Sequence, residues 1–369
     1  MNKIYSFQTV SKILFGIGAR KNLGDEAAKL GARPFVVVSR TLFERGDLTD
    51  DLRHRCKQVE IAVGPSGEPD IVYVEDIRSQ CRKVGCDVAV GIGGGSVLDA
   101  AKAVAALAHE PRSIEEVFYG ASVSQRGIPF VAVPTTAGTG TEVTPNSVLH
   151  DSKKRIKQSI RGGNMLARLV VNDPELTLDV PRQVKIWSGA DALTQAIESF
   201  TSLGANELTD ALAFRAFTLI ARRMAEVAGG STEIEPHVDM AYGSMLAGMA
   251  FANARLGAVH GLAHPLGVRY HIPHGLCCAI LLPAVMRFNE FVVAEKYAQL
   301  SAVVSEPIIP WISNLFRNIG IPATFAEYTI PQEDIEPIVQ ESLPSGSLKA
   351  NPRPVSGEDL VGILGEILE

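Results

Sequence analysis

In the first half of the chain, short apolar runs alternate with longer stretches whose apolar residues recur every three or four positions. The runs rich in β-branched residues cover residues 34–38, 87–92 and 129–133, and the stretches with helical spacing cover 71–84 and 97–109. Continuous apolar strands separated by amphipathic helices are typical of a parallel sheet buried on both faces. The pattern predicts an α/β nucleotide-binding domain.

The pattern changes at about Pro181, after which β-branched runs become scarce. Residues 184–203, 207–228 and 238–256 show helical spacing and are rich in Ala, Leu and Met. We therefore expect two domains, an α/β domain over 1–180 and an all-helical domain over 181–369. The cleft between two such domains is the expected position of the active site. Residues 342–357 are predicted to be a surface excursion before a final helix.

Composition agrees with an ordinary soluble protein. The 369 residues are 46% hydrophobic and 21% charged, which is enough apolar material for two cores. The net charge of -6 argues against a nucleic-acid partner, which would require clustered basic surface. We find no stretch of about 20 uninterrupted apolar residues and no apolar run at the start, so the simplest interpretation is a cytoplasmic enzyme without membrane segments.

The five cysteines are odd in number and show no CxxC spacing, as expected of reduced and mostly buried thiols. Cys277 and Cys278 are adjacent within an apolar run. We interpret both as packing residues rather than as metal ligands.

A glycine-rich loop follows the second predicted strand and opens a helix. It contains Gly93, Gly94, Gly95 and Ser96, with Asp99 in the helix that follows. Glycines allow the backbone to approach a diphosphate closely, and the free N–H groups and dipole of the helix N-terminus favour an anion. Three glycines also suit any tight turn, but the strand before them and the helix after them favour a phosphate site.

A second loop follows the third predicted strand and contains Thr135, Thr136, Gly138 and Thr139. Small hydroxyl residues at the carboxyl end of a strand can bond to ribose and phosphate oxygens, although a helix cap would use the same residues. A single dinucleotide would account for both loops, so it is the expected ligand.

The end of the first predicted strand bears on which dinucleotide is used. NAD enzymes often carry an acid there that bonds to the adenosine ribose, whereas this chain has Ser39 and Arg40. Ser39 removes the repulsion of a 2′-phosphate and Arg40 can pair with it. We therefore expect NADPH to be accepted or preferred, unless Arg40 simply points into solvent.

Four of the eight histidines lie within fifteen residues: His260, His264, His271 and His274. His260 and His264 are four apart and share one face of a helix. A break at residues 265–267 is expected to bring His274 back toward them. This density of imidazole in an apolar, glycine-rich segment is typical of a metal or catalytic site, and imidazole binds Fe²⁺ and Zn²⁺ well.

An anionic ligand for such a metal is available in residues 188–198. Asp191 lies in an apolar helical stretch, where a buried carboxylate needs a partner. Gln195 follows one turn later on the same face. Glu198 lies close to that face and is interpreted either as an acid that supports a ligand or as a solvent-exposed residue.

These motifs together resemble the iron-containing (group III) alcohol dehydrogenases, whose fold is shared with dehydroquinate synthase and glycerol dehydrogenase. The resemblance covers nearly the whole chain. Its ordered motifs are Gly93-Gly94-Gly95-Ser96 with Asp99 and Lys102, Pro134-Thr135-Thr136 with Gly138, Thr139 and Glu142, Asp173 to Thr177, Ser188 to Thr194, His260, His264 and Pro273-His274-Gly275, and Asn351-Pro352-Arg353.

The resemblance implies a role for each matching residue. The glycine loop would hold the pyrophosphate, and Asp191, His260 and His274 would hold the metal, with His264 beside the substrate. Further residues would surround the cofactor: Thr135, Thr136, Thr139 and Lys157 at the ribose and nicotinamide, Leu176 in contact with the cofactor, and Asp99 near the same cleft.

One position departs from the family pattern. The second metal ligand of the family is histidine, and Gln195 stands there in this chain. Three alternatives remain open. Gln195 coordinates through its carbonyl oxygen, or the metal is held by three ligands, or the enzyme reduces its substrate without metal, as maleylacetate reductases of this fold do. His271 is more readily interpreted as a neighbouring polar contact than as a replacement ligand.

The implied reaction is hydride transfer between NAD(P)H and an aldehyde, a ketone or the corresponding alcohol, with Fe²⁺ or Zn²⁺ as Lewis acid and His264 as proton relay. The alternatives are a metal-free maleylacetate-type reductase and a metal- and NAD-dependent lyase of the dehydroquinate synthase type. Another is a non-enzymatic nucleotide-binding module. The scarcity of lysines near the histidines disfavours the lyase. The resemblance also implies a homodimer acting on a small molecule.

Overall fold

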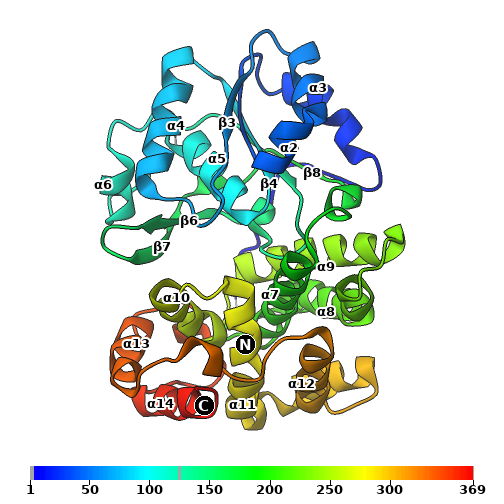
Figure 1. Ribbon diagram of the computed structural model, residues 1–369, viewed down its shortest axis with the longest axis vertical. Helices are drawn as coiled ribbons and strands as arrows, with labels where there is room; N and C mark the ends of the chain where they lie inside the picture. The colour runs from blue at the N-terminus through cyan, green and yellow to red at the C-terminus, as the bar shows by residue number, and fades with distance from the viewer. Residues whose placement is uncertain (1–3, 124–125, 369) are drawn as a thin grey trace. The chain divides into compact units, whose positions relative to one another are not determined.

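The computed structural model describes residues 4–123 and 126–368 of the chain, which divides into two compact units. The first unit is Thr9–Val180, and the second consists of residues 181–368 together with residues 4–8. The first is an α/β unit and the second is helical (Figure 1). The predicted combination of a parallel-sheet domain and an all-helical domain is confirmed.

A parallel sheet forms the centre of the first unit. Within the described residues it contains six strands in the order β1-β8-β5-β4-β2-β3, all parallel to their neighbours. The strands are β1 (Ile13–Phe15), β2 (Pro34–Val38), β3 (Glu60–Val63), β4 (Val88–Gly93), β5 (Phe130–Pro134) and β8 (Leu169–Asn172). A separate antiparallel hairpin is formed by β6 (Asn146–Asp151) and β7 (Ile156–Arg161).

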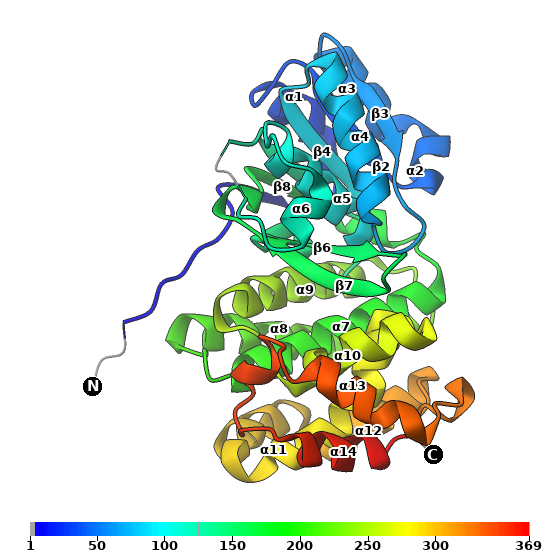
Figure 2. The same cartoon turned by 90° about the vertical axis from the view of Figure 1, so that its left-hand side faces the viewer.

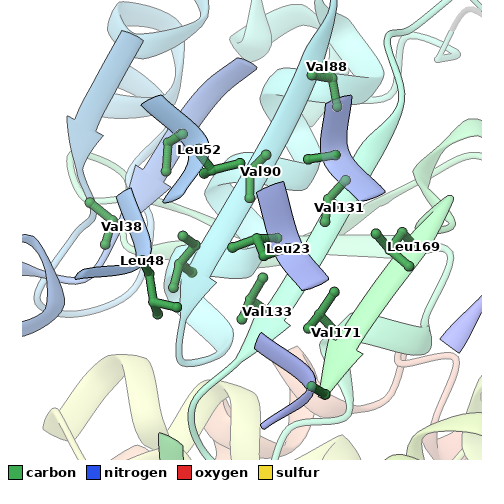
Figure 3. Close-up of a cluster of buried hydrophobic side chains, with 14 residues drawn as sticks. Leu23, Val38, Leu48, Leu52, Val88, Val90, Val131, Val133, Leu169 and Val171 are labelled. Carbon is green, nitrogen blue, oxygen red and sulfur yellow. The ribbon is translucent and has the colours of Figure 1, made fainter. Parts of the chain in front are cut away.

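The helices of the first unit cover both faces of this sheet. They are α1 (Leu23–Ala28), α2 (Arg40–Arg45), α3 (Asp47–Arg55), α4 (Ile71–Val84), α5 (Gly95–Leu107) and α6 (Ile114–Phe118). On one face, Leu23 of α1 and Leu52 of α3 pack in a fully buried cluster with Val90 and Val131 of the central strands (Figure 3). A Cβ at Gly91 would meet Ala101 and Leu98 of α5. Successive strand residues face opposite sides, so α5 covers the other face.

Eight helices are described in the second unit: α7 (Arg182–Thr201), α8 (Glu207–Ala228), α9 (Ile234–Ala254), α10 (Ala258–Tyr270), α11 (His274–Val304), α12 (Ile308–Ile319), α13 (Ile335–Ser342) and α14 (Gly357–Gly365). Helices α7, α8 and α9 run alongside one another (Figure 2). Asn206 begins α8 with a reciprocal cap, because its side chain accepts from Thr209 N while Thr209 Oγ1 accepts from Asn206 N.

Helix α11 is the one described helix that is long and apolar enough to cross a membrane, and it is kinked at Val293. However, 67% of its apolar window is buried inside the protein. A core helix of a soluble protein has the same pattern.

Two local predictions in this unit are wrong. The expected break at residues 265–267 does not occur, because α10 continues through Pro265 and the chain turns at His271, which has φ 55°. Pro265 has no N–H group, so the helix loses one hydrogen bond there. Leu262 and Leu266 are fully buried, and their packing keeps the segment helical. The predicted surface excursion over 342–357 is also wrong in part, because Leu348, Ala350 and Asn351 are buried.

Candidate cofactor and metal sites

The predicted glycine loop connects β4 to α5, as the sequence pattern indicates. Gly94 is the extended residue before α5, and Gly95 begins the helix. Gly94, Gly95 and Ser96 are partly exposed, whereas the helix is buried from Val97 to Leu107. The loop thus presents the N–H groups of a helix N-terminus at a solvent-accessible position, which suits an anion such as a pyrophosphate.

The second predicted loop, which contains Thr135, Thr136 and Thr139 and is called the threonine loop below, lies directly against the glycine loop. Thr135 N donates to Gly93 O (3.0 Å). A Cβ at Gly95 would lie 2.7 Å from Thr139 Cγ2, and one at Gly94 would lie 3.5 Å from Thr136 Cγ2. Any side chain at residue 95 would therefore displace Thr139. The structure brings Gly93, Gly94, Gly95, Thr135, Thr136 and Thr139 together in one place.

A buried lysine holds the end of the threonine loop against α5. Lys102 is fully buried, and its Nζ donates to Thr141 O (2.5 Å), Thr144 O (3.0 Å) and Asn146 O (2.8 Å). Burial lowers the pKa of Lys102 to about 8. Sequence reasoning noted Lys102 within a motif but assigned it no role.

Two buried acids lie in the surroundings of this lysine. Burial raises the pKa of Asp99 to about 7, although the positive charge of Lys102 opposes that shift. Burial also raises the pKa of Glu142 to about 7 against the same opposing charge. The Asp99 carboxylate is therefore enclosed in the protein, with 6% of the residue exposed.

The remaining predicted cofactor residues of the first unit have varied surroundings. Ser39 ends β2, and its N–H donates to Ile92 O (2.9 Å), while Arg40 is exposed at the start of α2. Lys157 Nζ forms an ion pair with Glu68 Oε1 (2.6 Å). Leu176 is partly buried and packs against the core cluster of the sheet.

In the second unit, four potential metal-ligating side chains converge from three helices. Asp191 lies on α7, His260 on α10, and His274 and Cys278 on α11. One ligand atom from each lies within 4.8 Å of all the others. Asp191, His260 and Cys278 are buried, and His274 is partly exposed. The structure thus brings Asp191, His260 and His274 together with Cys278, which sequence reasoning assigned to packing.

Four of the distances between these atoms are close to the ligand-to-ligand distances of a tetrahedral metal site. Asp191 Oδ1 lies 3.3 Å from His260 Nε2 and 3.8 Å from His274 Nε2. Cys278 Sγ lies 3.9 Å from His260 Nε2 and 3.7 Å from His274 Nε2. Ligands at ~2.0–2.3 Å from a tetrahedral Zn²⁺ are themselves about 3.3–3.8 Å apart. The donor set therefore fits a divalent transition metal.

Glu198 supports this site from the opposite side of His260. Glu198 is buried, and its Oε2 lies 2.6 Å from His260 Nδ1, which leaves Nε2 directed at Asp191. A carboxylate on the second nitrogen of a ligating histidine orients the ring and makes it a better donor. Of the two interpretations of Glu198 from sequence, the structure supports the buried acid.

The charges around His260 also indicate a cation-binding site. Burial lowers the pKa of His260, but its contacts with Cys278, Asp191 and Glu198 outweigh that effect and raise the pKa well above its usual value. Burial raises the pKa of the Cys278 thiol to about 11. The carboxyl groups of Asp191 and Glu198, on either side of the His260 ring, therefore favour a cation here.

The start of α10 is held in place by side chains from elsewhere in the same unit. Val259 N donates to Glu198 Oε1 (2.7 Å), and Ala258 N donates to Asn351 Oδ1 (3.1 Å). Asn351 also exchanges hydrogen bonds with the Asn289 carboxamide of α11. These bonds satisfy N–H groups that a helix N-terminus leaves without partners, and they position His260 in the first turn.

A glycine permits α11 to begin directly against α7. A Cβ at Gly275 would lie 2.0 Å from Trp187 O, so no other residue fits there without moving a helix. This contact places His274 and Cys278 close to Asp191 of the same α7 helix.

The other predicted residues lie around this set. The His264 ring is partly exposed, with its centroid 5.6 Å from that of His274. Gln195 is buried one turn after Asp191 on α7. His271 is exposed at the end of α10.

Two family models match most of the chain. Residues 10–174 match the model of the iron-containing alcohol dehydrogenases, and residues 185–368 match that of the C-terminal region of the Fe-containing alcohol dehydrogenase family. Lactaldehyde reductase of Escherichia coli (strain K12) is 34% identical, over 94% of this chain and 95% of the relative.

Solved structures show the same fold. The crystal structure of 1,3-propanediol oxidoreductase has a TM-score of 0.93 at 32% identity and covers 99% of this chain and 100% of its own. Sulfoacetaldehyde reductase from Bifidobacterium kashiwanohense, in complex with NAD⁺, has a TM-score of 0.92 at 27% identity over 99% of both chains. Enzymes of this family interconvert alcohols and carbonyl compounds with NAD(P) and a divalent metal. The chain belongs to the iron-containing alcohol dehydrogenase family.

Proposed function

We propose that this oxidoreductase interconverts an alcohol and its aldehyde or ketone with Fe²⁺ or Zn²⁺ held in the second unit by Asp191, His260 and His274. The observation that carries the proposal is the convergence of one carboxylate oxygen and two imidazole Nε2 atoms from three helices. An anionic oxygen and two neutral imidazoles are a common ligand combination for these metals.

The bound groups would supply the reactive chemistry, the metal as a Lewis acid toward the carbonyl oxygen and the nicotinamide as hydride donor or acceptor. Asp191 contributes the negative charge that retains the cation, and Glu198 orients His260. His264 is the proposed proton relay. Its partial exposure connects it to solvent, and imidazole exchanges protons near neutral pH.

The first unit is the proposed site for NAD(P)H. The glycine loop and Ser96 would bind the pyrophosphate through backbone N–H groups. Thr135, Thr136 and Thr139 would contact the ribose and nicotinamide. By resemblance to the family, Lys157 and Leu176 also belong to this site, and Asp99 lies near it; for Lys157 this requires release of its ion pair with Glu68.

Arg40 is expected to make NADPH an effective cofactor by pairing with its 2′-phosphate. Replacing Arg40 with alanine should lower kcat/KM for NADPH by about 10–100-fold, since a hydrogen bond to a charged group contributes roughly 1.5–3 kcal/mol. The value for NADH should not change. Steady-state kinetics with both cofactors measure the effect.

Arg45 provides a matched control, because it lies on the same short helix, is half-exposed and pairs with Asp179. Its alanine variant should leave both cofactors unaffected. A wild-type enzyme with a strong preference for NADH would contradict the role of Arg40.

Two other activities within this fold differ in their requirement for metal or in net reaction. A metal-free maleylacetate-type reductase would have no use for the buried donor set, and a lyase of the dehydroquinate synthase type would consume no net NAD(P)H. The decisive experiment is elemental analysis of the purified protein, followed by a carbonyl screen coupled to NAD(P)H.

We expect about one Fe²⁺ or Zn²⁺ per chain, and NAD(P)H consumption that a chelator abolishes and added metal restores. Full activity in a protein free of metal would overturn the proposal in favour of the metal-free reductase.

The family resemblance further favours a cytoplasmic homodimer that acts on a small alcohol or carbonyl compound, without a nucleic-acid or membrane partner. The mostly buried α11 and the net charge of -6 support that part of the proposal. Light scattering of the purified protein should give a molar mass twice that of the monomer.

A further inference from the structure

Cys278 occupies a position at the metal site that its sequence context does not suggest. It lies four residues after His274 on α11, so the two side chains share one face of the helix. Its Sγ is 3.7 Å from His274 Nε2 and 3.9 Å from His260 Nε2, and the residue is fully buried. Cys277, also fully buried, is not among the four grouped residues.

We propose, on the basis of the metal-dependent function above, that the Cys278 thiolate is the fourth protein ligand and takes the place that Gln195 would otherwise fill. The sulfur lies 3.7 Å from His274 Nε2, close to the 3.8 Å of the Asp191 oxygen, and 3.9 Å from His260 Nε2, where the Asp191 oxygen lies at 3.3 Å. One ion between Asp191, His260, His274 and Cys278 could therefore be reached by a ligand atom of each, because these atoms all lie within 4.8 Å of one another.

Ligand chemistry favours the sulfur over the amide. A thiolate is anionic and binds Zn²⁺ or Fe²⁺ at about 2.3 Å, whereas the carbonyl oxygen of Gln195 is neutral and a weak donor for these metals. A thiol that coordinates a divalent metal loses its proton, which passes to solvent. The high pKa that burial gives to Cys278 without a cation therefore does not prevent coordination.

The exchange of ligand also changes the charge of the site. Asp191 and a Cys278 thiolate together neutralise a divalent ion, whereas Asp191 with neutral ligands leaves one positive charge. A softer, neutral site favours Zn²⁺ in competition with Fe²⁺. We accordingly expect this enzyme to retain Zn²⁺ more readily than a site with one carboxylate and three neutral ligands.

Cobalt substitution tests the proposal directly, because a thiolate bound to Co²⁺ absorbs in the near ultraviolet and nitrogen or oxygen ligands do not. The full-length protein is stripped of metal, loaded with Co²⁺ and measured for its absorption spectrum and its Co²⁺ dissociation constant. Wild type should show the thiolate-to-cobalt band. Cys278→Ala and Cys278→Ser should lose it and bind Co²⁺ more weakly by at least the roughly 10–100-fold that loss of an outer-shell partner costs.

Cys277→Ala is the matched control, since it removes the same atoms at the adjacent, equally buried position. It should keep both the band and the affinity, as should Gln195→Ala. Cys278→Ser preserves size and polarity, so a folding defect in Cys278→Ala does not prevent the test.

Persistence of the band in Cys278→Ser, or its loss in Cys277→Ala, would overturn the assignment of Cys278. Loss of Co²⁺ binding in Gln195→Ala alone would show that the amide is the ligand. In these cases the wild type still binds metal, so the proposed function survives. A wild type that takes up no divalent metal would instead refute both proposals.

Discussion

Replacing His260 with alanine is expected to remove the metal and abolish turnover together. His260 Nε2 lies 3.3 Å from Asp191 Oδ1, and its Nδ1 is bonded to Glu198, so the ring connects the ligand set to its buried support. A Lewis-acidic metal contributes several kcal/mol to transition-state stabilisation, which is about a thousandfold in rate. Asp191→Ala should behave in the same way. Elemental analysis and NAD(P)H-coupled turnover measure both losses.

His264→Ala provides the contrast within the same helix. His264 is partly exposed and does not belong to the four grouped residues, so we expect its variant to keep the metal and lose activity more mildly. An exogenous base such as imidazole should restore part of that activity if His264 relays a proton. Metal content and turnover that both persist in His260→Ala or in Asp191→Ala would show that the ligand assignment is wrong.

Replacing Lys102 with methionine is expected to cost about 3–5 kcal/mol of unfolding free energy near pH 7, where Lys102 is still mostly charged, because the buried groups around it then lose their compensating charge. The variant leaves the carbonyl groups of Thr141, Thr144 and Asn146 without their lysine donor. Affinity for NAD(P)H should fall as well, because the same bonds hold the end of the threonine loop against α5. Urea denaturation and calorimetric titration of the cofactor measure the two effects.

The penalty should depend on pH in a defined direction. The pKa values of Asp99 and Glu142 are raised to about 7, so the folded protein tolerates these acids when protonated and loses stability as the pH rises through that value. Lys102 offsets part of this loss. The gap in unfolding free energy between wild type and Lys102→Met should therefore widen from about pH 5 to about pH 7, before Lys102 itself loses its proton near pH 8.

Lys29→Met is the control, because Lys29 is largely exposed, and its effect should stay within about 0.5 kcal/mol. A Lys102→Met protein with wild-type stability at pH 7 would mean that the surrounding acids do not depend on this charge.

An element was predictable from sequence where its hydrophobic pattern and the residues at its two ends indicated the same bounds. Strand 34–38 and helices 71–84 and 207–228 have the predicted bounds, since a capping residue precedes each helix and a glycine follows it. The continuation of α10 through Pro265 was not predictable in this way, because tertiary packing of Leu262 and Leu266 decides it. Local propensity identifies a possible end, and only the surrounding structure determines whether the helix ends there.

The candidate metal site was partly predictable for a similar reason. Histidine density and a buried acid pointed to His260, His274 and Asp191, and family resemblance assigned them one metal. Cys278 was missed because its apolar neighbours suggested packing. Its spacing of four residues from His274 was the available signal, and the same spacing had already linked His260 with His264. The role of Lys102 had no such signal, because its acceptors come from residues 141–146 and only the fold brings them to it.

The carboxamide of Asn351 has a consequence for shortened forms of the enzyme. It caps the helix that carries His260 and joins that helix to Asn289, although it lies far beyond the last ligand in the sequence. A gene product terminated before residue 351 would contain every metal ligand and yet lack the anchor that sets their geometry. The carboxyl-terminal segment is therefore part of what makes this protein a catalyst, and premature stop codons there are expected to be as damaging as ligand mutations.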